Sequence, residues 1–308
     1  MNFSKLLRGY LDAEDKVVIA PGAYDGLTAR LIAEAGFEAI YMTGGGSSAS
    51  RIGQPDLGLM TMTEMISNAR MIVECAELPV IADADTGYGN YLNVIRTVRE
   101  YERAGVAAIH LEDQAFPKKC GYMEGKQLVP IEEFVQKIKA AVDSRRNPDF
   151  IIIARTDARA VYGFEEAVSR VNLCIEAGAD VAFVEAPMTL DELRDIPRRV
   201  KAPCMSNVVG PASKTPPITT SDLQQMGYKI GIYPALCVGP VIYGIRKALR
   251  TLKEEGIGWD PEQLAGPLDL FTAVGLNEWN ALERKYALKK NPGDPELNAF
   301  SADDEKTN

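Results

Sequence analysis

The chain has 308 residues, 46% of them hydrophobic and 25% charged, which is ordinary for a globular enzyme with a sizeable core. A formal net charge of −9 and the absence of a basic run argue against binding to nucleic acid, and no apolar run is long enough to span a membrane. The N-terminal stretch MNFSKLLRGYLDAEDK lacks the apolar core of a signal peptide. A cytoplasmic protein is therefore expected.

Cysteine and histidine usage narrows the possible chemistry. The five cysteines form no CxxC pair, and their number is odd, which argues against a disulfide framework or a zinc site. The single histidine, His110, lies within the apolar run AAIHLED, so histidine-based metal sites and catalytic triads are not expected. Acid–base chemistry must then come from carboxylates, Cys, Tyr, Lys or Arg.

Short apolar runs recur along the chain and read as strands buried on both faces. Amphipathic segments separate them, and several of these end at a glycine directly before the next run, as a left-handed helix cap requires. Eight such repeats predict a (β/α)8 TIM barrel of the α/β class over residues 1–256. The predicted strands begin at Val17, Ala39, Pro79, Ala107, Phe150, Val181, Pro203 and Ile230.

The last part of the chain reads differently. Residues 257–290 are predicted to form a C-terminal arm of two helices, and the polar, proline-containing residues 291–308 to be disordered. The arm has an apolar periodic segment from Leu268 to Leu288 that needs a surface to cover. A homo-oligomer that exchanges these helices between subunits is therefore expected.

Polar residues follow six consecutive predicted strands, from the second to the seventh. Active sites of this barrel lie at the C-terminal ends of the strands. Strand ends also become polar simply by meeting solvent, but six in succession favour a shared site. The residues concerned are Tyr41, Thr43, Asp83, Asp85, Glu112, Arg155, Asp157, Glu185 and Asn207.

The segment DADTGYGN, from Asp83 to Asn90, places two carboxylates at one strand end. With Asp56 and Glu112 they form an oxygen-rich set without histidine, which suits Mg2+, or Mn2+ as a substitute. The alternative is that one of these acids caps a helix or pairs with Arg155.

The segment TGGGSS, from Thr43 to Ser48, is predicted to be a glycine-rich turn after a strand. Its backbone N–H groups could hold a carboxylate or phosphonate oxygen, although a plain connecting turn is equally compatible with the motif. It lacks the lysine of a nucleotide-binding P-loop.

A long segment without periodicity runs from Gln114 to Pro130, and loops of this length inside a barrel commonly serve as lids. It contains Cys120, flanked by Lys118 and Lys119. The two lysines are expected to favour the thiolate form, and the thiol could act as a nucleophile or as a proton donor.

The motifs KKCG, DADTGYGN, IARTDA and YMTGGG together resemble the isocitrate lyase/phosphoenolpyruvate mutase superfamily, over roughly Phe3–Gly256. The resemblance is closest to its small 2-methylisocitrate and 2,3-dimethylmalate lyases. It implies Mg2+-dependent cleavage of a carbon–carbon bond in a 2-hydroxy di- or tricarboxylate, which gives an α-keto acid such as pyruvate and a second carboxylate. It also implies a helix-swapped homotetramer.

The resemblance also implies roles for individual residues. Arg155 would neutralise the developing oxyanion, Tyr41 would handle the 2-hydroxyl proton, and Cys120 would protonate the enediolate left after cleavage. The implied metal ligands are Asp83 directly and, through water, Asp56, Asp85 and Glu112. The implied substrate-binding residues are Thr43, Gly44, Gly45, Lys118, Gly121, Tyr122, Glu185, Asn207 and Pro234.

Two departures from the lyase pattern concern the distal part of the substrate. Tyr122 stands where many lyases carry histidine, and the stretch VVGPASKTPP after Asn207 also differs. An oxaloacetate hydrolase or decarboxylase, which shares the cysteine loop, remains the main alternative, although Pro234 resembles the lyases. Phosphonate enzymes of the carboxyphosphonoenolpyruvate or phosphoenolpyruvate mutase type are less favoured, because they lack the cysteine.

Overall fold

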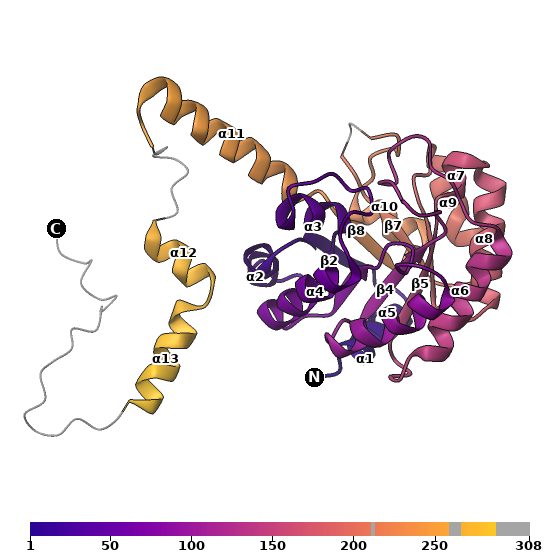
Figure 1. The fold of residues 1–308 in the computed structure, drawn as a ribbon, viewed down its shortest axis with the longest axis horizontal. Helices are drawn as coiled ribbons and strands as arrows, with labels where there is room; N and C mark the ends of the chain where they lie inside the picture. The colour runs from indigo at the N-terminus through magenta and orange to yellow at the C-terminus, as the bar shows by residue number, and fades with distance from the viewer. Residues whose placement is uncertain (211–212, 259–265, 288–308) are drawn as a thin grey trace, which may run out of the picture. The chain divides into compact units, whose positions relative to one another are not determined.

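The computed structural model describes residues 1–210, 213–258 and 266–287. Its parallel strands close into one barrel in the order β1 to β8, with helices around the outside (Figure 1). This confirms the predicted (β/α)8 architecture and the position of every predicted strand. The strands are β1 Val18–Ala23, β2 Ile40–Met42, β3 Val80–Asp83, β4 Ala108–Glu112, β5 Ile151–Thr156, β6 Val181–Val184, β7 Cys204–Asn207 and β8 Ile230–Tyr233.

The strands are apolar throughout because both of their faces are covered. Side chains such as Ile81, Ile153 and Phe183 fill the barrel interior, and none of the three has measurable exposure. Alternate residues, such as Ile109 and Ile152, pack outward against the helices. This double burial fixes the register of neighbouring strands, because a slip by one residue would exchange the two apolar sets.

The helices begin and end at residues that the sequence marks clearly. Asp25 and Thr61 cap α2 and α4 through their side chains, and Gly36, Gly105 and Gly178 have φ values of 80°, 85° and 105° directly after helices. The helices of the barrel unit are α1 Phe3–Asp12, α2 Gly26–Glu34, α3 Gly44–Arg51, α4 Met62–Ala76, α5 Tyr91–Arg103, α6 Ile131–Ser144, α7 Ala158–Val161, α8 Phe164–Glu176, α9 Leu190–Arg199, α10 Thr220–Met226 and α11 Val238–Glu255.

One local prediction was wrong. The segment after β2 is not a turn, because α3 begins at Gly44, directly after Thr43. The Thr43 hydroxyl accepts a hydrogen bond from the Gly46 amide and so caps the helix. A Cβ at Gly44 would lie 2.3 Å from Asp83 Oδ2, so glycine is needed here for close approach rather than for a turn. The first N–H groups of α3 have no partners within the helix and can still receive an anion.

The chain divides into two units, Met1–Leu264 and Ala265–Asn308. The second unit contains α12 Pro267–Ala273 and α13 Leu276–Tyr286. The predicted disordered tail, 291–308, lies outside the described residues. Among the residues that the structure describes, no helix is long and apolar enough to cross a membrane.

Candidate active site

The polar residues predicted from the strand ends lie together at the C-terminal mouth of the barrel. Adjacent strands place Asp83 beside His110 and Glu112 beside Arg155 in the ladder. All four side chains are buried, and Glu112 has no exposed surface. A water-excluded cluster of charges at this end of the barrel is therefore built directly by the strand register.

The carboxylates of this cluster surround a lysine. The Lys118 Nζ atom lies 2.5 Å from Asp56 Oδ1 and 2.6 Å from Asp85 Oδ1. Asp85 has a φ of 47°, in the left-handed region, and its amide donates a 2.9 Å hydrogen bond to Asp83 Oδ1. The turn after β3 thus directs both aspartates of the DADTGYGN motif into the site, as the sequence indicated.

The donor set has the chemistry of a divalent cation site. Neither carboxylate oxygen of Glu112 accepts a hydrogen bond, although Arg155 Nε lies 3.3 Å from one of them. Burial, together with the nearby charges of Asp83 and Asp56, raises the pKa of Asp85 to about 6 despite the opposing effect of Lys118. Such a cluster gains stability when another cation neutralises it. The residues therefore fit Mg2+.

The fit to Mg2+ does not depend on a preformed metal cage. Among the described residues, no three carboxylates, cysteines or histidines already converge as a complete metal cage, and Lys118 supplies the positive charge between Asp56 and Asp85. Mg2+ commonly binds through one or two carboxylates and keeps several waters, so a preformed cage is not required. Asp83 suits direct ligation best. Burial would raise its pKa, but His110, Lys118 and Arg155 hold it at about 2.

His110 also lies in the site, although it was not among the residues predicted for it. Its Nε2 atom lies 2.8 Å from the Tyr41 hydroxyl and 3.7 Å from Asp83 Oδ1. Burial lowers the pKa of His110 to about 4, and burial together with the Asp83 charge raises the pKa of Tyr41 well above its usual range. Both groups are therefore uncharged near neutral pH. The period-two pattern of β4, which directs His110 inward with Glu112, could have revealed this.

Arg155 is the second fixed positive charge of the site. Its Nε atom lies 3.1 Å from Asp157 Oδ2, and its guanidinium lies 5.3 Å from the centre of the Phe183 ring. Burial opposes its charge, but Asp157 and Glu112 more than compensate and raise its pKa. A buried guanidinium held by carboxylates in this way is preorganised to stabilise an oxyanion.

The loop between β4 and α6, residues 113–130, crosses the mouth as a lid. The Gln114 side chain bonds to both the N–H and the C=O of Lys119, at 3.0 and 2.8 Å, and Gln114 also pairs with Leu128. The Cys120 amide donates to the Asp56 carbonyl at 3.1 Å. One interaction that holds the lid was not predicted from the sequence. Buried Lys126 forms an ion pair with Asp157 at 2.9 Å and donates a hydrogen bond to the Gly121 carbonyl.

The expectation that neighbouring lysines favour a Cys120 thiolate was wrong. Lys118 turns to the two aspartates, and Lys119 Nζ donates to the Glu124 carbonyl at 3.3 Å. Burial raises the pKa of Cys120, and Asp56 adds to this effect. The thiol is therefore neutral near pH 7, which suits a proton donor and not a nucleophile. The lysines were misjudged because sequence adjacency does not fix where long side chains point.

Another part of the barrel mouth is formed by residues at or just after the ends of β6, β7 and β8, together with Tyr122 of the lid. The Asn207 amide donates to Glu185 Oε1 at 3.2 Å, and burial raises the pKa of Glu185. Tyr122, on the lid, lies 3.3 Å through its hydroxyl from Thr215 Oγ1. Pro234 directly follows β8, where a Cβ at Gly22 would lie 2.4 Å from its carbonyl oxygen. The predicted substrate-binding residues thus come from both the strands and the lid.

Gly121 offers a test of how tightly the lid must close. A Cβ at this position would lie 2.5 Å from Glu185 Oε1 and 2.7 Å from Arg155 Nη2. Gly121→Ala should therefore hold the lid away from the site and lower kcat/KM by about 10² in steady-state assays, the scale reported for small misplacements of reacting groups. Gly9→Ala, on α1 with no atom within 4 Å of the added Cβ, is the matched control. Equal activity of Gly121→Ala and wild type would contradict the closed geometry.

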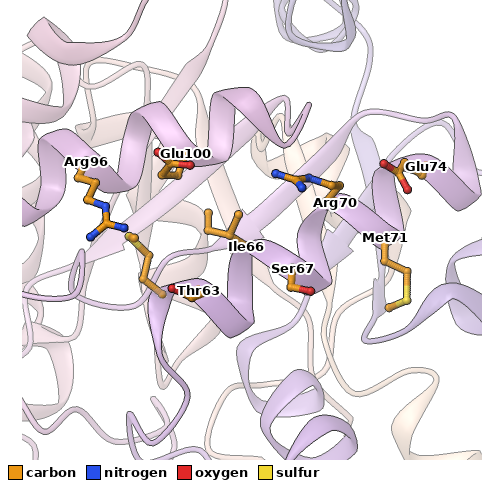
Figure 2. Close-up of a pocket in the computed structure, with 9 residues that line it drawn as sticks. Thr63, Ile66, Ser67, Arg70, Met71, Glu74, Arg96 and Glu100 are labelled. Carbon is orange, nitrogen blue, oxygen red and sulfur yellow. The ribbon is translucent and has the colours of Figure 1, made fainter.

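A separate groove lies on the outside of the barrel. It has a volume of about 350 Å3 and is lined by side chains of α4 and α5, including Ile66, Arg70 and Glu100 (Figure 2). None of its lining residues belongs to a strand end or to the lid. The groove is therefore not part of the site at the barrel mouth.

The barrel, the buried carboxylates and the cysteine lid define a (β/α)8 enzyme for carboxylate chemistry. Residues 7–253 match the model of the phosphoenolpyruvate phosphomutase family, and the chain belongs to this family. It is 48% identical over 282 residues to 2,3-dimethylmalate lyase of Eubacterium barkeri, covering 92% of this chain and 94% of that protein. It is 42% identical to 2-methylisocitrate lyase of Aeropyrum pernix, covering 92% and 91%. The expected superfamily and the expected class, an enzyme of the carbon–carbon lyase type, are confirmed.

Solved structures agree with the fold. An oxaloacetate acetylhydrolase in complex with 3,3-difluorooxalacetate superposes with a TM-score of 0.88 at 37% identity, covering 92% of this chain and 97% of that chain. A phosphonopyruvate hydrolase in complex with oxalate and Mg2+ superposes with a TM-score of 0.83 at 32% identity, covering 93% and 99%. A fold shared among these enzymes leaves the reaction to be argued from the site itself.

Proposed function

We propose that the protein cleaves the C2–C3 bond of a 2-hydroxy dicarboxylate or tricarboxylate of the 2,3-dimethylmalate or 2-methylisocitrate type. One product is an α-keto acid such as pyruvate, and the other is a second carboxylate, with one carboxylate group from a dicarboxylate substrate and two from a tricarboxylate. The observation that carries this proposal is the neutral thiol of Cys120, held on a closed lid. The Cys120 amide donates a 3.1 Å hydrogen bond to the Asp56 carbonyl, so this residue of the lid lies directly beside the carboxylate cluster.

A divalent cation, Mg2+ or Mn2+, would be held by Asp83, with Asp56, Asp85 and Glu112 around it through water. When bound, it would polarise the 2-hydroxyl and the adjacent carboxylate and neutralise negative charge that develops during cleavage. The similar hydrolase with bound Mg2+ and the unsatisfied oxygens of Glu112 support this assignment.

The substrate would be fixed at its two ends. Thr43, Gly44 and Gly45, at the N-terminus of α3, would receive the C1 carboxylate. The Thr43 amide already donates to the Ala23 carbonyl, so Thr43 would donate through its hydroxyl, and Gly44 and Gly45 through their N–H groups. Lys118, Gly121, Tyr122, Glu185, Asn207 and Pro234 would contact the remainder. Closure of the lid would exclude water from the carbanion-like intermediate.

The chemistry divides among three side chains. Tyr41 would accept the 2-hydroxyl proton while it passes its own proton to the neutral His110 Nε2, 2.8 Å away, so that the proton ends on the imidazole. As the hydroxyl oxygen becomes a carbonyl, the C2–C3 bond breaks and its electron pair moves into the second carboxylate, giving an enediolate. Arg155 would stabilise the developing oxyanion. Cys120 would then transfer its proton to C3, and the resulting thiolate would be reprotonated from solvent.

The test of this proposal is a substrate panel followed by keto-acid release. 2,3-Dimethylmalate and 2-methylisocitrate should be turned over far faster than oxaloacetate. A strong preference for oxaloacetate would instead support a hydrolase, the alternative suggested by the similar acetylhydrolase structure.

We also propose that the protein is a homo-oligomer, a tetramer or a dimer of helix-swapped dimers. In a single chain α11 has no buried residue, and its Ile245, Leu249 and Leu252 are each at least half exposed. Trp279 of α13 is 67% exposed. Apolar faces of this extent are normally covered. Light scattering at micromolar concentration should give a multiple of 33.6 kDa, and a monomer would contradict the proposal.

A further inference from the structure

Two loops from different parts of the chain meet at the mouth of the barrel. The lid contributes Tyr122, and the β7–α10 loop contributes Thr215, with their hydroxyl oxygens 3.3 Å apart. Thr215 is only 2% exposed. A second link, Lys214 to Glu124 at 3.3 Å, is solvent-exposed at both ends and contributes little. The hydroxyl pair is therefore the less exposed of these two links between the loops.

Tyr122 stands next to two different spaces. The preceding residue, Gly121, lies against the site, because a Cβ there would be 2.5 Å from Glu185 Oε1 and 2.7 Å from Arg155 Nη2. Tyr122 also lines a pocket of about 400 Å3. This pocket is also lined by Lys126, Arg159 and Lys214, which pair with Asp157, Glu192 and Glu124 respectively.

We propose that Tyr122 and Thr215 form a wall that limits the length of the acid and makes the enzyme selective for a dicarboxylate over a tricarboxylate. This inference rests on the proposed function. Thr215 fixes the Tyr122 ring through the hydroxyl pair, and the ring closes the distal end of the site against the cation-lined pocket. Tyr122 and Thr215 are thus specificity-determining residues that take no part in bond cleavage.

Charge supports the same selectivity. On the site's side of the ring, the distal groups are Glu185, Asn207 and Tyr122, which are acidic or uncharged. The nearby cation Arg155 is already held by Asp157 and Glu112. A third substrate carboxylate would lose its water there without gaining a free cation, which is costly. A methyl substituent needs no such partner and can pack against the aromatic ring.

The experiment compares kcat/KM for 2,3-dimethylmalate and 2-methylisocitrate, starting with wild type, which should favour the dicarboxylate. Tyr122→Phe and Thr215→Val each remove one hydroxyl and keep the shape. Each should raise KM for the dicarboxylate about tenfold, equivalent to about 1.4 kcal/mol, with kcat nearly unchanged. The double variant should raise KM for the dicarboxylate no further than either single variant does, because the two hydroxyls act as one pair. Tyr122→Ala should open the wall and shift the selectivity ratio at least about tenfold toward the tricarboxylate.

Lys214→Ala, which breaks only the exposed link, is the control and should leave the ratio unchanged. Equal use of both acids by wild type would overturn the inference and leave the lyase function intact. If the ratio of kcat/KM for the two acids and the KM values were unchanged in Tyr122→Phe, Thr215→Val and Tyr122→Ala, the proposed role of these residues as a wall would be contradicted. A wild-type enzyme that cleaves neither acid would remove the proposed function and this inference together.

Discussion

Asp83→Ala should lose almost all turnover, about 10³-fold or more, because a bound cation that polarises the substrate supplies several kcal/mol to the transition state. Asp83 is the carboxylate of the cluster with the strongest tendency to stay ionised, since its pKa is held at about 2. Its removal leaves the positive charges of Lys118 and Arg155 less compensated and takes away the proposed direct metal ligand. Steady-state kinetics at saturating Mg2+ measure the loss.

The same reasoning gives the metal dependence of the wild type. Excess EDTA should abolish turnover, and added Mg2+ or Mn2+ should restore it. The matched control for Asp83→Ala is Asp191→Ala, at an exposed position paired with Arg194, which should behave as wild type. Full activity in EDTA, together with no bound metal by elemental analysis, would contradict the oxygen-ligand site.

Cys120→Ser should retain binding of Mg2+ and of the keto-acid product but lose turnover by about 10²-fold or more, the expected effect of losing a general acid. The substitution preserves size, whereas a serine hydroxyl is a far weaker acid than a thiol. Cys75→Ser, at a half-buried thiol of α4, is the matched control. Near-normal cleavage by Cys120→Ser, with a collapse of kcat in Tyr122→Phe, would assign the proton to Tyr122 instead.

The pH profile of the wild type provides a second readout of Cys120. A proton donor must be protonated before the step, and burial raises the pKa of this thiol. Activity that depends on the thiol should therefore persist through neutral pH and fall as the pH rises through the raised pKa. Cys120→Ser should lose this alkaline decline within the accessible range, whereas Cys75→Ser should keep it.

Much of the fold could be predicted because its signals are local. Buried parallel strands read as apolar runs, and glycines such as Gly105 mark the helix ends by their positive φ. Most residues of the candidate site could also be predicted from their positions at strand ends, because a closed barrel brings these ends together at one mouth. Thr43 to Ser48 was misjudged because glycines usually signal a turn, while here they allow a helix to approach Asp83.

The remaining features depend on side-chain directions across the barrel. His110 looked like one more residue of an apolar strand, and only the closed ladder shows that it faces Tyr41 and Asp83. Lys126 and Asp157 are far apart in the sequence, so their pairing could not be inferred from spacing. The chemical state of Cys120 likewise follows from burial and from where Lys118 points, which no local pattern specifies.

The most direct test of the proposed reaction is product analysis by NMR with 2,3-dimethylmalate and Mg2+ in D2O. Retro-aldol cleavage with protonation at C3 should give pyruvate and propionate in equal amounts, with a single deuterium at C2 of the propionate. The rate should far exceed that of oxalate and acetate formation from oxaloacetate under the same conditions. Unchanged 2,3-dimethylmalate alongside rapid production of oxalate and acetate would contradict the lyase assignment.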